Sequence, residues 1–137
     1  MPAAEEKGAR NFQLKTPMRT RYSFSYAEKL HLQKDFQRVF KTGRKLAHPA
    51  IFIYICPVDN PHGLRRLGLI FSRKLGGAVE RNRLKRRLRE IFRLNKESLT
   101  PSLDILFVPR AGACALDYDG LKDAVLGLYK KAGILQQ

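Results

Sequence analysis

Apolar residues recur every three or four positions in three segments of the chain, which is the spacing of one helical face. In the first segment Phe36, Val39 and Phe40 follow this spacing, and Gly43 after them suits a helix end in the left-handed conformation. Before the last segment, Asp117 is a residue type that caps helix N-termini. Helices are therefore predicted over residues 33–42, 78–95 and 117–131.

Three other segments are short, apolar and rich in β-branched or aromatic residues, which is typical of strands. They cover residues 50–56, 66–72 and 103–109. Because side chains alternate across a strand, Phe52 and Tyr54 are expected on the same face of the first one. The order of elements predicts a single-domain α/β or α+β fold, a two-layer α/β sandwich with helices packed on one sheet. The strand–helix–strand unit also predicts that two of the strands are parallel.

The chain ahead of these elements has a different character. Residues 1–21 are polar and irregular and carry several Lys and Arg, so we expect a flexible basic extension before a domain over residues 22–137. The extension lacks the apolar stretch of a signal peptide, and the longest apolar run, near residues 51–56, is too short to span a bilayer. Cys56 and Cys114 lack metal-type spacing and are interpreted as reduced core thiols of a cytoplasmic protein.

Positive charge narrows the choice of partner. The chain carries 27 Lys and Arg against 12 Asp and Glu, a formal net charge of +15 in 137 residues. This balance points to a polyanionic partner, most often a nucleic acid, with an anionic membrane surface as the alternative. The charge is densest in the helix predicted over residues 78–95, where seven Lys or Arg fall between Arg81 and Arg93. On a helical wheel, Leu84 and Leu88 lie on the apolar side and the cations cover the rest.

An ordinary solvated helix face explains this charge poorly. Like charges four residues apart destabilise a helix by about 0.2–0.5 kcal/mol each, and cations in the first turn oppose the helix dipole. An external polyanion would remove this cost, and arginine suits bidentate phosphate contacts. We therefore favour nucleic-acid binding. Charge alone does not separate DNA from RNA, but four aromatic residues hint at unpaired bases, because they can line a stacking groove between the first helix and the sheet. They are Phe36, Phe40, Phe52 and Tyr54, and plain core packing is the alternative for each of them.

One segment resembles a known signature. The decapeptide RNRLKRRLRE, residues 81–90, is similar to the RNR signature of the bacterial ribonuclease P protein subunit. Further segments resemble the same family in the same order, namely KDFQRVFKTGRK (34–45), RLGLIFSRKLGGAVERNR (66–83), DILFVPR (104–110) and LDYDGLKDAVLGLYKKAG (116–133). The resemblance covers about residues 24–133. The sequence departs from the family at Gly77, where Asn is frequent.

The resemblance implies a ribosomal-protein-S5-like fold with a left-handed βαβ crossover. It also implies a subunit that binds a catalytic RNA and the 5′ leader of precursor tRNA, and so promotes endonucleolytic removal of that leader. The residues implied to face the ribonuclease P RNA are Arg73, Lys74, Arg81, Asn82, Arg83, Lys85, Arg86 and Arg89. Phe36, Phe40 and Tyr54 match positions of the leader-binding cleft, and Phe52 is predicted to belong to the same cleft.

The chain offers no convincing catalytic set of its own. Its three histidines stand in dissimilar contexts, and no paired carboxylates or metal-type spacing are evident. We therefore expect no catalytic or metal-binding side chain, with catalysis in the RNA and Mg²⁺ bound mainly by RNA and substrate phosphates. One protein per RNA and no membrane partner are expected. Two alternatives stay open: a structural or ribosomal-type RNA-binding protein, and a protein-only nuclease.

Overall fold

The computed structural model describes residues 24–59 and 62–136. Its strands are β1 (Arg44–Ala47), β2 (Ile51–Pro57), β3 (Arg65–Leu69) and β4 (Leu103–Pro109). Its α-helices are α1 (Gln33–Thr42), α2 (Ala78–Asn95) and α3 (Tyr118–Ala132). Short 3-10 helices are η1 (Tyr26–Glu28), η2 (Arg73–Leu75), η3 (Lys96–Ser98) and η4 (Ala111–Ala115). The three predicted α-helices and three predicted strands are thus confirmed, with shifts of a few residues at their ends.

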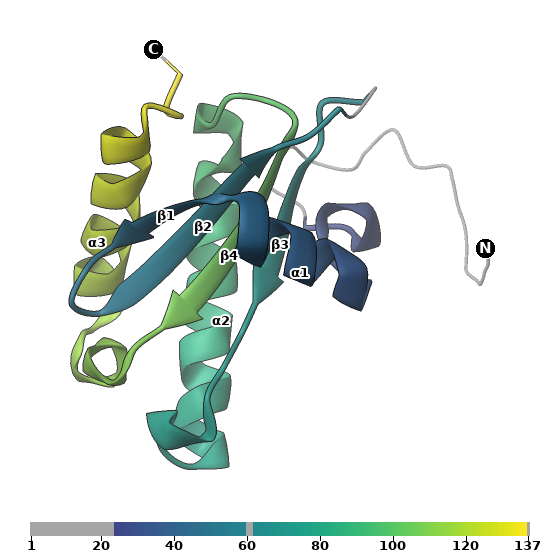
Figure 1. The fold of residues 1–137 in the computed structure, drawn as a ribbon. Coiled ribbons are helices and arrows are strands. Elements are labelled where there is room, and N and C mark those ends of the chain that lie inside the picture. The colour runs from purple at the N-terminus through teal and green to yellow at the C-terminus, as the bar shows by residue number, and fades with distance from the viewer. Residues whose placement is uncertain (1–23, 60–61, 137) are drawn as a thin grey trace.

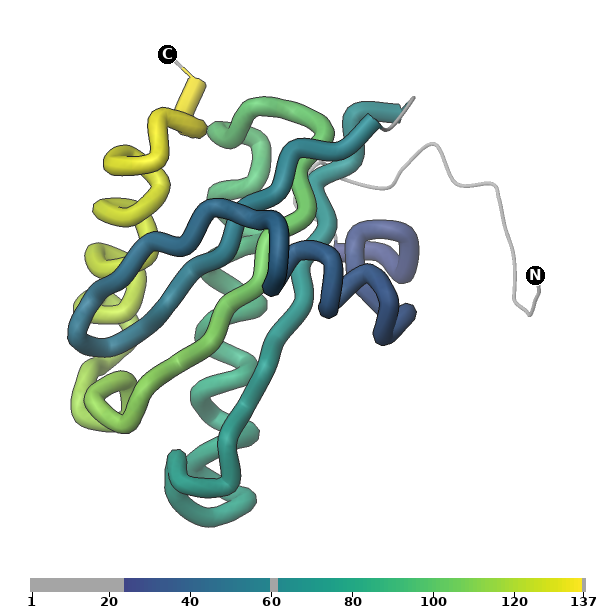
Figure 2. The backbone as a smooth tube through the Cα atoms, viewed as in Figure 1, coloured from purple at the N-terminus to yellow at the C-terminus, as the bar shows by residue number. Residues whose placement is uncertain are grey.

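The four strands form one sheet in the order β1-β2-β4-β3 (Figure 1). β1 and β4 each pair with β2 in the antiparallel sense, while β3 and β4 are parallel and joined through α2. The predicted parallel pair is therefore confirmed. β1 was not predicted from the sequence, because this short polar strand has Leu46 as its only buried residue. Its extended conformation depends on pairing with β2. Figure 2 shows the backbone running from α1 directly into the hairpin that β1 and β2 form.

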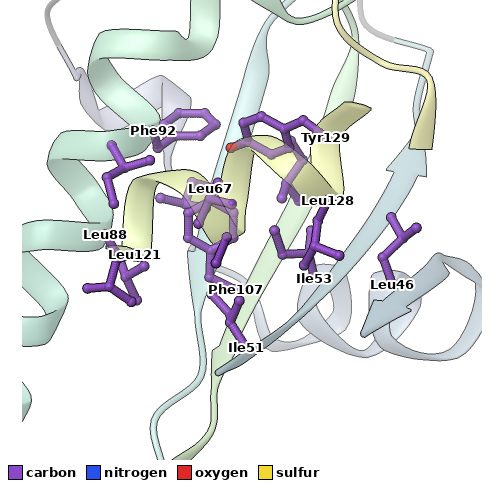
Figure 3. Packing of buried hydrophobic residues seen from close by; sticks show 14 of the residues in the cluster. Leu46, Ile51, Ile53, Leu67, Leu88, Phe92, Phe107, Leu121, Leu128 and Tyr129 are labelled. Carbon is purple, nitrogen blue, oxygen red and sulfur yellow. The ribbon is translucent and has the colours of Figure 1, made fainter. Parts of the chain in front are cut away.

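Helices cover both faces of the sheet. α2 and α3 lie on one face over the larger apolar cluster, in which Phe107 of β4 contacts Phe92 and Tyr129 at ring-centroid distances of 6.4 Å (Figure 3). α1 lies on the other face over a smaller cluster that contains Tyr54 and Leu106. The predicted sandwich of helices on a sheet is confirmed, and α1 adds partial cover on the second face (Figure 1).

Local chemistry fixes the ends of the helices. The side chain of Asp117 accepts the backbone N–H of Gly120 at 2.8 Å, so the predicted cap of α3 is confirmed. α1 ends before Gly43 as expected, but the left-handed conformation was wrong, because Gly43 has φ −74° and ψ 157°. Glycine is required there for another reason: a Cβ atom would run into the carbonyl oxygen of Val39.

The two cysteines lie in different environments. Cys56 is buried under α1, as expected of a core thiol, and both cysteines are free. Cys114 is exposed, so its assignment to the core was wrong. It lies in the short helix η4, and its thiol donates a hydrogen bond to the carbonyl of Leu75 at 3.0 Å. The predicted basic extension, residues 1–21, lies outside the described residues.

Candidate nucleic-acid interface

The basic helix α2 buries one side and exposes the rest, as predicted. Its buried side chains are Leu84, Leu88, Ile91 and Phe92. The helix starts after Gly77, whose N–H donates to the carboxylate of Glu80 at 3.3 Å, and this acidic residue in the first turn suits the helix dipole. Gly77 has φ −77°, and a Cβ there would meet nothing within 4 Å, so other residue types would fit the same backbone. The positive φ of 111° belongs to Gly76.

The cations of α2 lie along two separate edges of the helix. Lys85 and Arg89 open on a depression of about 270 Å³ between α2, β3 and the segment before α1. Arg83, Arg86 and Arg87 open on a second depression of about 460 Å³, which Tyr118 of α3 also lines. A helical wheel treats these residues as one surface. In the fold they open on two different depressions, Lys85 and Arg89 on one side of the buried stripe and Arg83 and Arg87 on the other.

Several of these side chains have no anionic partner. Within the described part of the chain, Arg83, Arg86 and Arg89 make no ion pair, whereas Arg93 pairs with Glu90 at 2.6 Å. This pairing raises the pKa of Arg93 and lowers the pKa of Glu90, in each case chiefly through the hydrogen bond between them. Uncompensated cations repel one another, so the surface is a site that favours an external polyanion.

The remaining predicted RNA-binding residues surround the start of α2. Arg73 and Lys74 are exposed in η2, which immediately precedes the turn into α2, and the hydroxyl of Ser72 accepts the N–H of Lys74 at 3.1 Å. Arg81 bends back, and its guanidinium donates to the carbonyl of Gly76 at 2.7 Å. Asn82 is exposed on the outer side of α2. All eight predicted RNA-binding residues thus lie on η2 and α2.

The four predicted aromatic residues share the sheet face that α1 covers. Phe40 is 51% exposed, and its ring centroid lies 4.7 Å from that of Tyr54, which is only 8% exposed. Tyr54 is therefore the more buried of the two, although its hydroxyl group suits a surface position better than a phenyl ring does. Phe36 packs on Gly68 of β3, where an added Cβ would lie 2.5 Å from the phenyl ring. Phe36 also borders the depression that Lys85 and Arg89 line.

Phe52 lies further along the same face and has cations over its ring. The ammonium of Lys45 lies 4.1 Å from the ring centroid, and the guanidinium of Arg110 lies 4.5 Å from it. Such contacts are favourable cation–π interactions. They place two cations beside Phe52, Lys45 of β1 and Arg110 just after β4, and neither was among the predicted site residues.

A buried carboxylate ties α1 to the sheet. Asp104 of β4 is fully buried and accepts hydrogen bonds from Arg38 of α1 at 2.6 Å and from Arg66 of β3, twice, at 2.7 Å. Asp35 of α1 adds an ion pair to Arg38 at 3.2 Å. The hydrogen bond to Asp104 is the main cause that raises the pKa of both arginines. Sequence reasoning missed this network, although a lone acid inside an apolar strand was its signal.

No group of three or more His, Cys, Asp or Glu side chains converges as metal ligands in residues 24–59 and 62–136. Over the same residues, none of the helices has the length and apolar character needed to cross a membrane.

Comparison with known proteins identifies the family. A family model described as Ribonuclease P matches residues 24–133. The chain belongs to the ribonuclease P protein family. The ribonuclease P protein component of Clostridium botulinum is 36% identical over 107 residues, which cover 77% of this chain and 95% of the relative. That of Dictyoglomus thermophilum is 35% identical over 118 residues, which cover 85% and 97% of the two chains. Membership supports a subunit role in tRNA processing, as the resemblance implied.

Solved structures agree with this family and confirm the α+β fold. The RNase P protein of Staphylococcus aureus is similar with a TM-score of 0.71 at 30% identity, covering 80% of this chain and 98% of that one. The RNase P protein from Thermotoga maritima has a TM-score of 0.68 at 33% identity, covering 76% and 96%.

Proposed function

We propose that this ribonuclease P protein binds two RNAs at once, one on each edge of α2. The edge with Lys85 and Arg89 binds the 5′ leader of precursor tRNA, and the edge with Arg83 and Arg86 binds the ribonuclease P RNA. The observation that carries this proposal is that, of the two edges, only the first shares its depression with one of the predicted cleft aromatics, Phe36.

A single-stranded leader suits the chemistry of the cleft. Unpaired bases stack on exposed aromatic rings such as Phe40, while their phosphates bind nearby cations. The other edge offers Arg83 and Arg86, which form no ion pair within the described residues, beside the half-buried ring of Tyr118, and these guanidinium groups suit the phosphates of a folded RNA. Arg73, Lys74 and Asn82 extend this second surface around the start of α2.

The holoenzyme is then an endoribonuclease in which the RNA performs the reaction. The protein lowers the electrostatic repulsion between the leader and the catalytic RNA and so strengthens substrate binding. Mg²⁺ is bound mainly by RNA and substrate phosphates, whose oxygens are the ligands this ion prefers. We propose one protein per RNA, acting in the cytoplasm.

Reconstitution tests this function directly. Cleavage of a precursor tRNA at low Mg²⁺ is measured with the protein alone, with a bacterial ribonuclease P RNA alone, and with both. Leader removal is expected only with both components. Cleavage by the protein alone would mean a protein-only nuclease, and a matched RNA that gains nothing from the protein would favour a structural RNA-binding protein.

The cleft is tested by Phe40→Ala. This exposed ring contributes little to folding, so its loss is expected to weaken holoenzyme binding of precursor tRNA while binding of mature tRNA stays unchanged. Leu94→Ala is the matched control, because Leu94 is also an exposed apolar residue but lies near the C-terminal end of α2. Equal losses for precursor and mature tRNA would remove Phe40 from the leader site.

A further inference from the structure

An exposed aromatic stack lies beside the cleft, outside the residues assigned so far. Tyr26 of η1 is 75% exposed, and its ring stacks on that of His31 with a centroid distance of 3.7 Å and an interplanar angle of 17°. The Nε2–H group of His31 donates to the backbone carbonyl of Tyr26 at 2.9 Å. This bond fixes the imidazole against the phenol, so one face of Tyr26 is covered and the other is open to solvent.

The stack is built on a firmly held segment. The carboxylate of Glu28 accepts the backbone N–H of Ser25 at 2.8 Å and also pairs with the buried ammonium of Lys96. The N–H of Leu30 donates to the carbonyl of Leu67 in β3 at 2.9 Å. Tyr26 is therefore presented by a turn tied to both η3 and the sheet, which lowers the entropy lost when a ligand stacks on it.

The stack is continuous with the proposed leader cleft. Lys29 and His31 line the depression that contains Phe36, Lys85 and Arg89. The same two residues line the neighbouring depression of about 510 Å³, which Tyr26 borders. The two depressions are therefore neighbours that share Lys29 and His31, so a single strand in the first one ends close to Tyr26.

The local charge favours a polyanion. The two carboxylates nearby are already paired. Glu28 pairs with Lys96, and Asp35 pairs with Arg38 at 3.2 Å and with Arg66 at 4.0 Å. Lys29 lies between the two depressions with its ammonium 5.0 Å from the ring centroid of Phe24. Because both acids are paired and Lys29, which is half-buried, adds a positive charge, no net repulsion toward phosphates remains here.

We propose that Tyr26 and His31 form a stacking platform for one further unpaired base of the leader, next to the bases held by the cleft. The inference rests on the proposed function, because the occupant is the same single strand. An exposed ring with a rigid support and one open face is what sequence-tolerant base stacking requires.

Abasic leaders test the platform. Precursors with a leader of about 10 unpaired nucleotides, a span within the range that one single-strand-binding domain covers, carry one abasic nucleotide at each position in turn and a non-cleavable linkage at the cleavage site. Holoenzyme affinity is measured with the wild-type chain, Tyr26→Ala, Tyr26→Phe and Phe40→Ala. Tyr26→Phe keeps the ring and is the matched control.

Tyr26→Ala is expected to weaken binding of the complete leader about fivefold to tenfold, the lower part of the range for base–aromatic stacking. At one or two positions the abasic nucleotide should cost nothing further in Tyr26→Ala, and these positions should differ from those coupled to Phe40→Ala. Tyr26→Phe should match the wild type.

If the effect of Phe40→Ala is coupled to certain abasic positions and the effect of Tyr26→Ala is coupled to none, the platform is overturned and the proposed function stays intact. A Tyr26→Ala loss that is the same at every abasic position, or is seen equally with mature tRNA, would also overturn it and assign Tyr26 to another contact. If no abasic position affects the wild-type holoenzyme, the leader cleft itself is wrong.

Discussion

Replacing Asp104 with Asn tests what holds α1 on the sheet. Asp104→Asn keeps the shape of the side chain but removes its charge and one of its two acceptor oxygens. The amide NH₂ group that replaces this oxygen must face a guanidinium group. Both groups are hydrogen-bond donors, so no hydrogen bond forms between them. The change therefore breaks a buried polar connection between α1, β3 and β4.

The size of the effect follows from the geometry. Asp104 accepts three charge-assisted hydrogen bonds of 2.6–2.7 Å, each of a kind that contributes about 1.5–3 kcal/mol. The sum overstates the loss, because Arg38 and Arg66 are 34% and 27% exposed and can regain water. We expect the free energy of unfolding to fall by about 3 kcal/mol, with a Tm roughly 10 °C lower.

Urea denaturation followed by circular dichroism measures this loss. Asp35→Asn is the matched control, because Asp35 contacts the same two arginines at 3.2 and 4.0 Å from a less buried position, and we expect a loss of at most about 1 kcal/mol. The Asp104 effect should persist in high salt, since a buried pair is screened little. Losses of similar, small size for both variants would refute the role of Asp104 as the anchor of α1.

Three further predictions concern the other surfaces and the core. Arg83→Ala should weaken binding to ribonuclease P RNA and reduce the slope of log affinity against log salt by about one, measured by titration at several salt concentrations. Gly68→Ala should lower the free energy of unfolding by about 1–3 kcal/mol in urea, because its Cβ would lie 2.5 Å from the Phe36 ring. Burial raises the pKa of Tyr129, and its hydroxyl is the one buried side-chain polar atom without a partner in the described residues. Tyr129→Phe should therefore leave stability unchanged or raise it by up to about 1 kcal/mol in the same assay.

Each of these has a control or a contradicting result. Lys130→Ala, at an exposed position of α3, should leave the slope of log affinity against log salt unchanged. If Lys130→Ala reduces this slope as much as Arg83→Ala does, α2 is not a distinct RNA-binding face. Gly127→Ala should stabilise α3 by roughly 0.5–1 kcal/mol, because a Cβ there meets nothing within 4 Å. A loss at Gly127 as large as at Gly68 would exclude the ring contact as the cause. A clear loss of stability in Tyr129→Phe would mean that the hydroxyl has a bound partner.

Local periodicity was enough to predict most elements of this chain. The stripe of Leu84, Leu88, Ile91 and Phe92 depends only on residues within one helix, and so its burial could be predicted without knowing what covers it. The dense cations around that stripe, with the motifs on either side, also led to the correct family. β1 escaped prediction because a short polar strand exists only through its partner β2.

Tertiary structure alone decided how these elements combine into a candidate site. Asp104 accepts hydrogen bonds from Arg38 and Arg66, which lie 66 and 38 positions before it in the sequence. No local sequence pattern predicts contacts over such separations. Phe40 is exposed and Tyr54 is buried, and the polarity of the two side chains does not predict this order. The division of the α2 cations into two edges likewise depends on what packs beside the helix. The sequence by itself determined which residues carry charge and rings, whereas long-range packing determined which of them meet.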